Sequence, residues 1–154
     1  MTLLWAVLLL PLLGSTGTIL LKSRLPRRTI GIWASSMIVL AFFASIGIDV
    51  KLASLPAAAR VWTPAIAPFV TGFGPAVWWR FYIDPLSSVW LLIITGVGAL
   101  IHIYSVGYME GERDESTYFA YLNFFIFAME LLVLAGNLVI LLIGWALVGL
   151  ASYW

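Results

Sequence analysis

The stretch LSSVWLLIITGVGALIHIYSV, residues 86–106, decides the fold, because it is a long apolar run that contains no Asp, Glu, Lys or Arg. A helix rises about 1.5 Å per residue, so about 20 apolar residues cross a hydrocarbon core roughly 30 Å thick. This stretch therefore predicts a transmembrane helix. Four other long apolar runs occur, at residues 3–21, 30–48, 118–135 and 138–154, and Glu130 is the only charged residue among them. We expect an all-α integral membrane protein with about five transmembrane helices in a single membrane domain, residues 1–154.

The composition agrees with lipid as the surrounding solvent. Hydrophobic residues make up 63% of the chain and charged residues 10%, with a mean hydropathy of +1.07, whereas soluble domains are roughly a quarter charged. A net charge of +1, with the basic residues in short loops, gives no surface for nucleic acid.

The sequence also lacks the side chains of most cofactor sites. It contains no cysteine and one histidine, which excludes disulfides, iron–sulfur clusters and a conventional zinc site. No phosphate-binding or dinucleotide-binding glycine motif occurs. We therefore expect no metal, no cofactor and no catalytic residue in this chain.

The loops predict the orientation in the membrane. The first loop holds four of the eight basic residues, namely Lys22, Arg24, Arg27 and Arg28, and short basic loops stay in the cytoplasm. The N-terminus and the long connection at residues 49–83 are then external. We expect that connection to be irregular, with a short strand at residues 77–83, and we expect Ser116 to cap the fourth helix.

The N-terminal run is interpreted as a retained anchor rather than a signal peptide, because it lacks a basic region and a clear cleavage site. No Arg- and Ser-rich amphipathic leader precedes it. A multi-pass protein of a bacterial cytoplasmic membrane is therefore the first expectation, and an organelle inner membrane is the alternative.

Polar residues recur at a helical spacing inside two of the predicted spans. Ser88, Thr95 and His102 follow one another every seven residues, close to two helical turns, so they share one face that should point into the bundle. Asn123, Glu130 and Asn137 repeat this spacing from the fourth span. For Ser88, Thr95, Asn123 and Asn137, hydrogen bonding between helices explains the pattern as well as a functional role does.

Glu130 is the only acidic side chain deep in a predicted span. A lone ionised carboxylate in hydrocarbon is so costly that the group should be neutral, paired or hydrated. Ionisable residues inside membranes are functional candidates by default. We therefore predict that Glu130 and His102 are proton-transfer groups, with a buried structural role as the alternative for each.

Several longer words in the second half of the chain are specific. They are YIDPLS (82–87), TGVGALIHIYSVGYM (95–109), YFAYLNFF (118–125), GW (144–145) and VGLASY (148–153). These words resemble the N-terminal part of the antiporter-like L subunit, or chain 5, of respiratory complex I, the NADH-quinone oxidoreductase. The resemblance is strong over residues 81–153 and only architectural before them.

The resemblance implies a membrane subunit that performs no redox chemistry itself and translocates protons coupled to electron transport in a respiratory chain. Its partners would be the other membrane subunits of that complex, and this chain would be the N-terminal portion of a longer subunit. A cation/proton antiporter or energy-converting hydrogenase membrane subunit is the first alternative. A non-transporting membrane scaffold or truncated remnant is the second.

One departure from the family bears on mechanism. The family usually has Trp-Glu in the fifth span, and that glutamate handles protons, but here Trp145 is followed by Ala146. We measure the depth of each position along its helix from the loop that joins the fourth and fifth spans. The depths of Glu130 and position 146 then differ by less than one helical turn. The hypothesis is that Glu130 partly replaces the lost carboxylate, provided that the two side-chain directions converge. The turn departs as well, with Ala135-Gly136-Asn137-Leu138 in place of Ala-Asp-Asn-Leu.

Overall fold

A computed structural model describes residues 1–70 and 77–153. Residues 71–76 of the predicted external connection, and Trp154 at the end of the fifth predicted span, lie outside the described residues. Within the described chain there are five α-helices, a short 3-10 helix and two strands. The elements are α1 (Thr2–Leu21), α2 (Arg27–Ala53), η1 (Ala57–Ala59), β1 (Ala65–Val70), β2 (Val77–Arg80), α3 (Pro85–Tyr108), α4 (Glu115–Val133) and α5 (Leu138–Tyr153).

The prediction of an all-α membrane protein is confirmed. Helices α1 to α4 are long and apolar enough to cross a membrane, and α5 is a shorter apolar helix of 16 residues. Helix α2 begins three residues before the predicted span and ends five residues after it. The hydropathy pattern finds only the lipid-immersed part of a helix, whereas hydrogen bonding continues through flanking polar residues such as Arg27 and Lys51.

Two helix starts show how local chemistry sets the boundaries. Asp84 caps α3, since its carboxylate accepts from Ser87 N at 2.7 Å while Asp84 N donates to Ser87 Oγ at 2.8 Å, and Pro85 occupies the first helical position. The prediction that Ser116 caps α4 is wrong. That helix begins at Glu115 with Asp114 at the cap position, because Tyr118 N already donates to Asp114 O at 3.0 Å.

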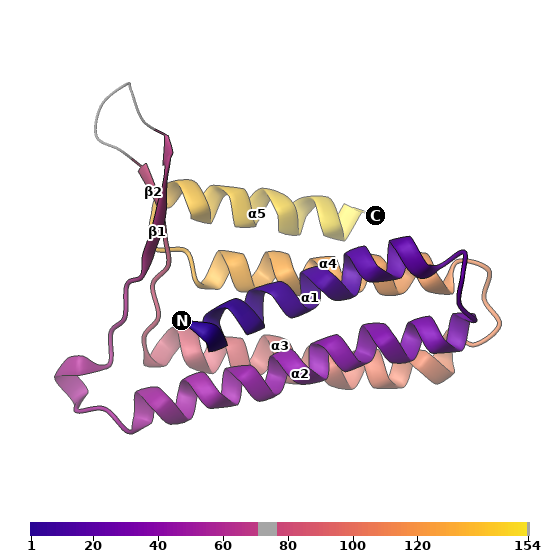
Figure 1. Ribbon diagram of the computed structural model, residues 1–154, viewed down its shortest axis with the longest axis horizontal. Coiled ribbons are helices and arrows are strands. Elements are labelled where there is room, and N and C mark those ends of the chain that lie inside the picture. The colour runs from indigo at the N-terminus through magenta and orange to yellow at the C-terminus, as the bar shows by residue number, and fades with distance from the viewer. Residues whose placement is uncertain (71–76, 154) are drawn as a thin grey trace.

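Helices α1 to α4 pack side by side as a bundle, and α5 lies against the outer side of α4 (Figure 1). The loops from α1 to α2 and from α3 to α4 lie at one end of this bundle, here called the loop end. The two-stranded hairpin lies across the other end, here called the hairpin end. This alternation is what a chain crossing a membrane repeatedly requires.

The hairpin is antiparallel and is held on the turn between α4 and α5. Tyr82 N donates to Leu134 O and Gly136 N donates to Arg80 O, both at 2.9 Å. The predicted strand at residues 77–83 is thus found in part, as β2 followed by isolated bridges at Phe81 and Ile83.

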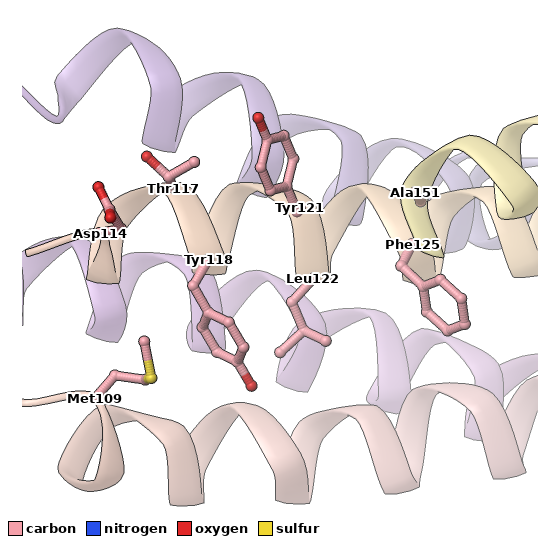
Figure 2. A pocket seen from close by; sticks show the side chains of 8 residues that line it. All are labelled: Met109, Asp114, Thr117, Tyr118, Tyr121, Leu122, Phe125 and Ala151. Carbon is pink, nitrogen blue, oxygen red and sulfur yellow. The ribbon is translucent and has the colours of Figure 1, made fainter. Parts of the chain in front are cut away.

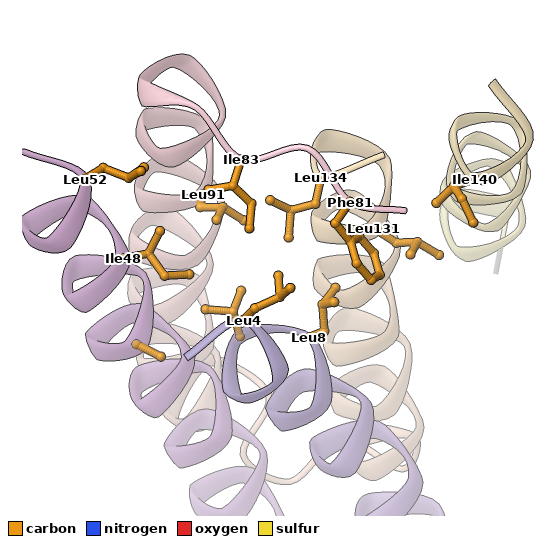
Figure 3. Packing of buried hydrophobic residues seen from close by; sticks show 12 residues of the cluster. Leu4, Leu8, Ile48, Leu52, Phe81, Ile83, Leu91, Leu131, Leu134 and Ile140 are labelled. Carbon is orange, nitrogen blue, oxygen red and sulfur yellow. The ribbon is translucent and has the colours of Figure 1, made fainter. Parts of the chain in front are cut away.

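A large cluster of buried apolar side chains lies at the hairpin end of the bundle, and Figure 3 shows this cluster from close by. The cluster draws on all five helices and the hairpin: Leu4, Val7, Leu8, Ala44, Ile48, Leu52, Phe81, Ile83, Leu91, Leu131, Leu134 and Ile140. A smaller cluster lies nearer the middle of the bundle, at Ile38, Ile94, Ala99 and Ile126. Because lipid tails are as apolar as these side chains, close packing and hydrogen bonds hold such a bundle together. The polar contacts between helices therefore contribute to the stability of the bundle.

Candidate functional site

The polar stripe of α3 points into the bundle, as its spacing predicts. Ser88, Thr95 and His102 are all fully buried. Each touches a different partner, so the stripe forms three separate polar levels along the helix rather than one cluster.

The first two levels join α3 to α2. Ser88 Oγ donates to Asp49 Oδ1 at 2.9 Å near the hairpin end. Two turns further along α3, Thr95 Oγ1 lies 3.0 Å from Ser45 Oγ, and either hydroxyl can donate to the other. These hydroxyls also contact carbonyl groups of their own helices, Leu91 O and Phe42 O. A hydroxyl has one proton and two acceptor positions, so this pair can change its direction of donation.

The third level joins α3 to α4 through His102 and Asn123. His102 Nδ1 lies 2.7 Å from Gly98 O, and a carbonyl can only accept, so Nδ1 carries a proton. Asn123 Nδ2 lies 3.0 Å from His102 Nε2 and also donates to Phe119 O at 3.0 Å. The amide nitrogen is a donor, which makes Nε2 an acceptor and the imidazole ring neutral.

Glu130 lies inside the bundle rather than against lipid. Its side chain is fully buried, and among the described residues neither carboxyl oxygen has a hydrogen-bond partner. Neighbouring contacts fix its depth, because α3 and α4 run in opposite directions. His102 meets Asn123, and a Cβ on Gly98 would lie 2.7 Å from Ile126. One further turn brings Glu130 to the level of Thr95 and its partner Ser45.

Glu130 does not face position 146. Helices α4 and α5 are in close contact where a Cβ on Gly144 would lie 2.8 Å from the backbone of Leu132. Glu130 and Ala146 are each two residues from this contact, about 200° around their helices, and so point away from it on opposite sides. Glu130 is buried and Ala146 is exposed. The convergence that the replacement hypothesis required is absent, and we do not pursue that hypothesis.

Asn137 does not belong to the stripe of α4, because that helix ends at Val133. Its Oδ1 accepts from Ile140 N at 3.0 Å and its Nδ2 donates to Trp78 O at 2.7 Å. Asn137 therefore caps α5 and ties it to the hairpin. The seven-residue spacing extends beyond the end of α4, so it could not indicate that Asn137 caps α5.

One polar contact escaped the sequence reasoning. Ser105 Oγ lies 3.0 Å from Tyr118 Oη, one turn beyond His102 toward the loop end. Its signal was present, since Ser105 follows His102 by three residues and shares its face of α3.

An open apolar groove of about 580 Å³ lies on the outer side of α4 (Figure 2). Tyr118 and Tyr121 of α4 line it, together with Met109 and Ala151. Neither Glu130 nor the pair of His102 and Asn123 lines this groove. The buried ionisable groups therefore form a site of their own, inside the bundle.

These features define a multi-pass membrane protein whose helix contacts carry buried, ionisable polar groups. Residues 71–119 match the family described as NADH-Ubiquinone oxidoreductase (complex I), chain 5 N-terminus. The chain thus carries the N-terminal region shared by NADH-quinone oxidoreductase subunit L and chain 5, and the resemblance predicted from its sequence words is confirmed.

Individual relatives agree. NADH-quinone oxidoreductase subunit L of Mycobacterium tuberculosis is 58% identical over 71 residues, which cover 46% of this chain and 11% of the relative. Subunit L of Pseudomonas aeruginosa is 37% identical over 135 residues, covering 80% of this chain and 21% of the relative. NADH-ubiquinone oxidoreductase chain 5 of Marchantia polymorpha is 32% identical over 147 residues, covering 96% and 22%. The chain therefore spans about a tenth to a fifth of the length of these relatives.

Proposed function

We propose that the chain works as the N-terminal membrane part of a proton-translocating NADH-quinone oxidoreductase subunit, with Glu130 and His102 as proton-transfer groups. The names of its relatives support the host complex. The observation that carries the assignment of residues is the Glu130 carboxyl group. It is fully buried, without a hydrogen-bond partner among the described residues, at the level of the Ser45–Thr95 hydroxyl pair.

An unpaired ionised carboxylate is strongly disfavoured in such surroundings. Glu130 is therefore expected to hold a proton at rest and to release it when a positive charge or a chain of water molecules comes near. No fixed ion pair holds this carboxyl group in one state within the described bundle. A carboxyl group of this kind can take up and release a proton, which a permanently ion-paired carboxylate does poorly.

His102 supplies a second site for a proton. Its Nε2 accepts a hydrogen bond from the Asn123 amide in the neutral state. Once protonated, Nε2 becomes a donor, and rotation of the Asn123 amide would present its oxygen as the acceptor. The same pair of side chains can thus satisfy either state of the ring.

The two groups are too far apart for direct exchange. His102 and Thr95 are seven residues apart on α3, a rise of roughly 10 Å. Water molecules between the polar levels would have to complete the route. The hydroxyl groups of Thr95 and Ser45 lie at the level of Glu130 and can donate in either direction, so they could take part in such a route.

The test uses the intact complex. Glu130→Gln should lower proton translocation per electron transferred while assembly is preserved, and Glu110→Gln in the exposed loop between α3 and α4 is the matched control. Unchanged proton translocation in Glu130→Gln would contradict the role of Glu130.

A non-transporting scaffold is the second candidate, and Ala146 is the observation that favours it, because the usual family glutamate is missing there. A scaffold predicts that Glu130→Gln and Glu110→Gln behave alike. A subunit of a cation/proton antiporter or an energy-converting hydrogenase is the remaining alternative. It predicts co-purification with a different set of membrane subunits.

The surroundings follow from the host complex. We propose other membrane subunits of a respiratory complex as partners, in a bacterial cytoplasmic membrane, with an organelle inner membrane as the alternative. Relatives occur in both bacteria and Marchantia polymorpha.

A further inference from the structure

Two more buried polar atoms, one on α1 and one on α4, take no part in the contacts described above. They are Thr18 Oγ1 and Asn123 Oδ1. Both side chains are fully buried, and within residues 1–70 and 77–153 neither atom has a hydrogen-bond partner. An unpaired polar atom in an apolar interface is costly, so two of them point to a missing polar companion.

The amide nitrogen and the amide oxygen of the Asn123 side chain face different helices. Its amide nitrogen donates to His102 on α3. Its oxygen faces α1, since a Cβ added to Gly14 would overlap Asn123 Oδ1. Thr18 follows Gly14 by one turn on the same face of α1. Thr18 Oγ1 therefore belongs to the face of α1 that meets Asn123, and this face also borders Met37 of α2.

A small cavity lies between the end of α1 and the start of α4, at the loop end. Its volume is about 190 Å³, and it is lined by Ile19, Lys22, Ser116, Thr117, Ala120 and Tyr121. Ile19 is next to Thr18 in the chain, and Ala120 lies one turn before Asn123. The lining residues include one that carries an ammonium group, Lys22, and three that carry hydroxyl groups, beside the apolar Ile19 and Ala120. Since a liquid water molecule occupies roughly 30 Å³, the cavity has room for several.

We propose that water penetrates between α1 and α4 from the loop end as far as Asn123, and that Thr18 Oγ1 and Asn123 Oδ1 bind its innermost molecule. The hydroxyl group can donate or accept and the amide oxygen can accept, which gives such a water two of the partners that it needs. The amide of Asn123 then connects this water to His102. This inference rests on the proposed function only for its consequence, namely that the route would bring protons to His102.

The chain offers a clean background for testing the route, because it contains no cysteine. Thr18→Cys nearly preserves side-chain size and places one thiol at the inner end of the route. The probe is the silver ion, which is small, hydrophilic and thiol-reactive. The variant is reconstituted in lipid nanodiscs, treated with silver nitrate, then denatured and alkylated with N-ethylmaleimide to count the thiols that remain free.

Ala44→Cys is the matched control, because Ala44 is buried in the apolar cluster near the hairpin. We expect silver to block the thiol of Thr18→Cys, with loss of alkylation, and to leave that of Ala44→Cys free. Adding Ser116→Trp at the mouth of the cavity should slow the blocking of Thr18→Cys. The circular dichroism of each variant checks that its helices form.

A free thiol in Thr18→Cys after silver treatment would overturn the route, as would equal blocking of Thr18→Cys and Ala44→Cys. A Ser116→Trp substitution without effect on the rate would overturn the position of the mouth. The measurement reports access of an ion through water and not transport. The two experiments therefore have independent outcomes. Silver can block Thr18→Cys even if Glu130→Gln leaves proton translocation unchanged, and it can fail to block Thr18→Cys even if Glu130→Gln lowers translocation.

Discussion

Asn123 donates a hydrogen bond from its Nδ2 to His102 Nε2 across 3.0 Å, and both side chains are fully buried between α4 and α3. The contact fixes the tautomer of the only histidine in the chain and joins two consecutive helices. It gives the polar stripe of α3 a defined partner on α4.

Replacing Asn123 by Leu should destabilise the bundle by about 1–2 kcal/mol, since side-chain hydrogen bonds in membrane proteins contribute about 0.6 kcal/mol each and His102 Nε2 would be left unpaired. Unfolding of the reconstituted chain by sodium dodecyl sulfate, followed by circular dichroism, measures the change. Ser36→Ala is the control, because this exposed hydroxyl bonds only to its own helix at Ile32 O. Equal stability of the two variants would contradict the prediction.

Gly14→Ala on α1 should disturb the hydrogen bond between Asn123 and His102 and lower the stability of the bundle. The new methyl group would overlap Asn123 Oδ1, so α1 must move away or the amide must rotate out of its bond to His102. Overpacking of this kind typically costs about 1–3 kcal/mol. The control is Gly149→Ala on α5, where a Cβ would meet nothing within 4 Å. A Gly14→Ala variant as stable as Gly149→Ala would show that the interface between α1 and α4 is looser than described.

Gly136→Ala should loosen the hairpin from the end of the bundle. A Cβ there would lie 2.6 Å from Arg80 O, the carbonyl group to which Gly136 N donates. Limited proteolysis should cut Gly136→Ala faster in the hairpin than the parent chain. Gly107→Ala, with open space around its Cβ, should be cut at the rate of the parent.

The positions of polar residues along α3 were predictable, whereas their partners were not. A spacing of seven places Ser88, Thr95 and His102 on one face because the helix repeat is local. Ser45 and Asp49, which bind two of them, lie 50 and 39 residues away in the chain. No local pattern encodes which faces of two distant helices meet.

The same limit explains why the sequence could not decide whether Glu130 and position 146 converge. Depth follows from the rise per residue, so the two positions were correctly expected at similar levels. Direction depends on which face of α4 touches α5, and the contact of Leu132 with Gly144 decides this. The role of Asn137 was missed for a simpler reason, since the helix that carries the stripe ends at Val133 before reaching it.

Glu130→Met should separate a structural from a functional role. If the carboxyl group served only packing, an apolar side chain of similar length would do at least as well, because among the described residues Glu130 has no hydrogen bond to lose. Removing an unsatisfied buried polar group should raise the free energy of unfolding by about 1–3 kcal/mol. The proposed function adds a second expectation, that proton translocation by the complex falls in the same variant. Gain of stability with loss of transport is the expected signature, and Glu110→Met in the exposed loop should change neither quantity.

A less stable Glu130→Met would mean that the carboxyl group holds the bundle together, and a more stable variant with full transport would leave Glu130 outside the proton route.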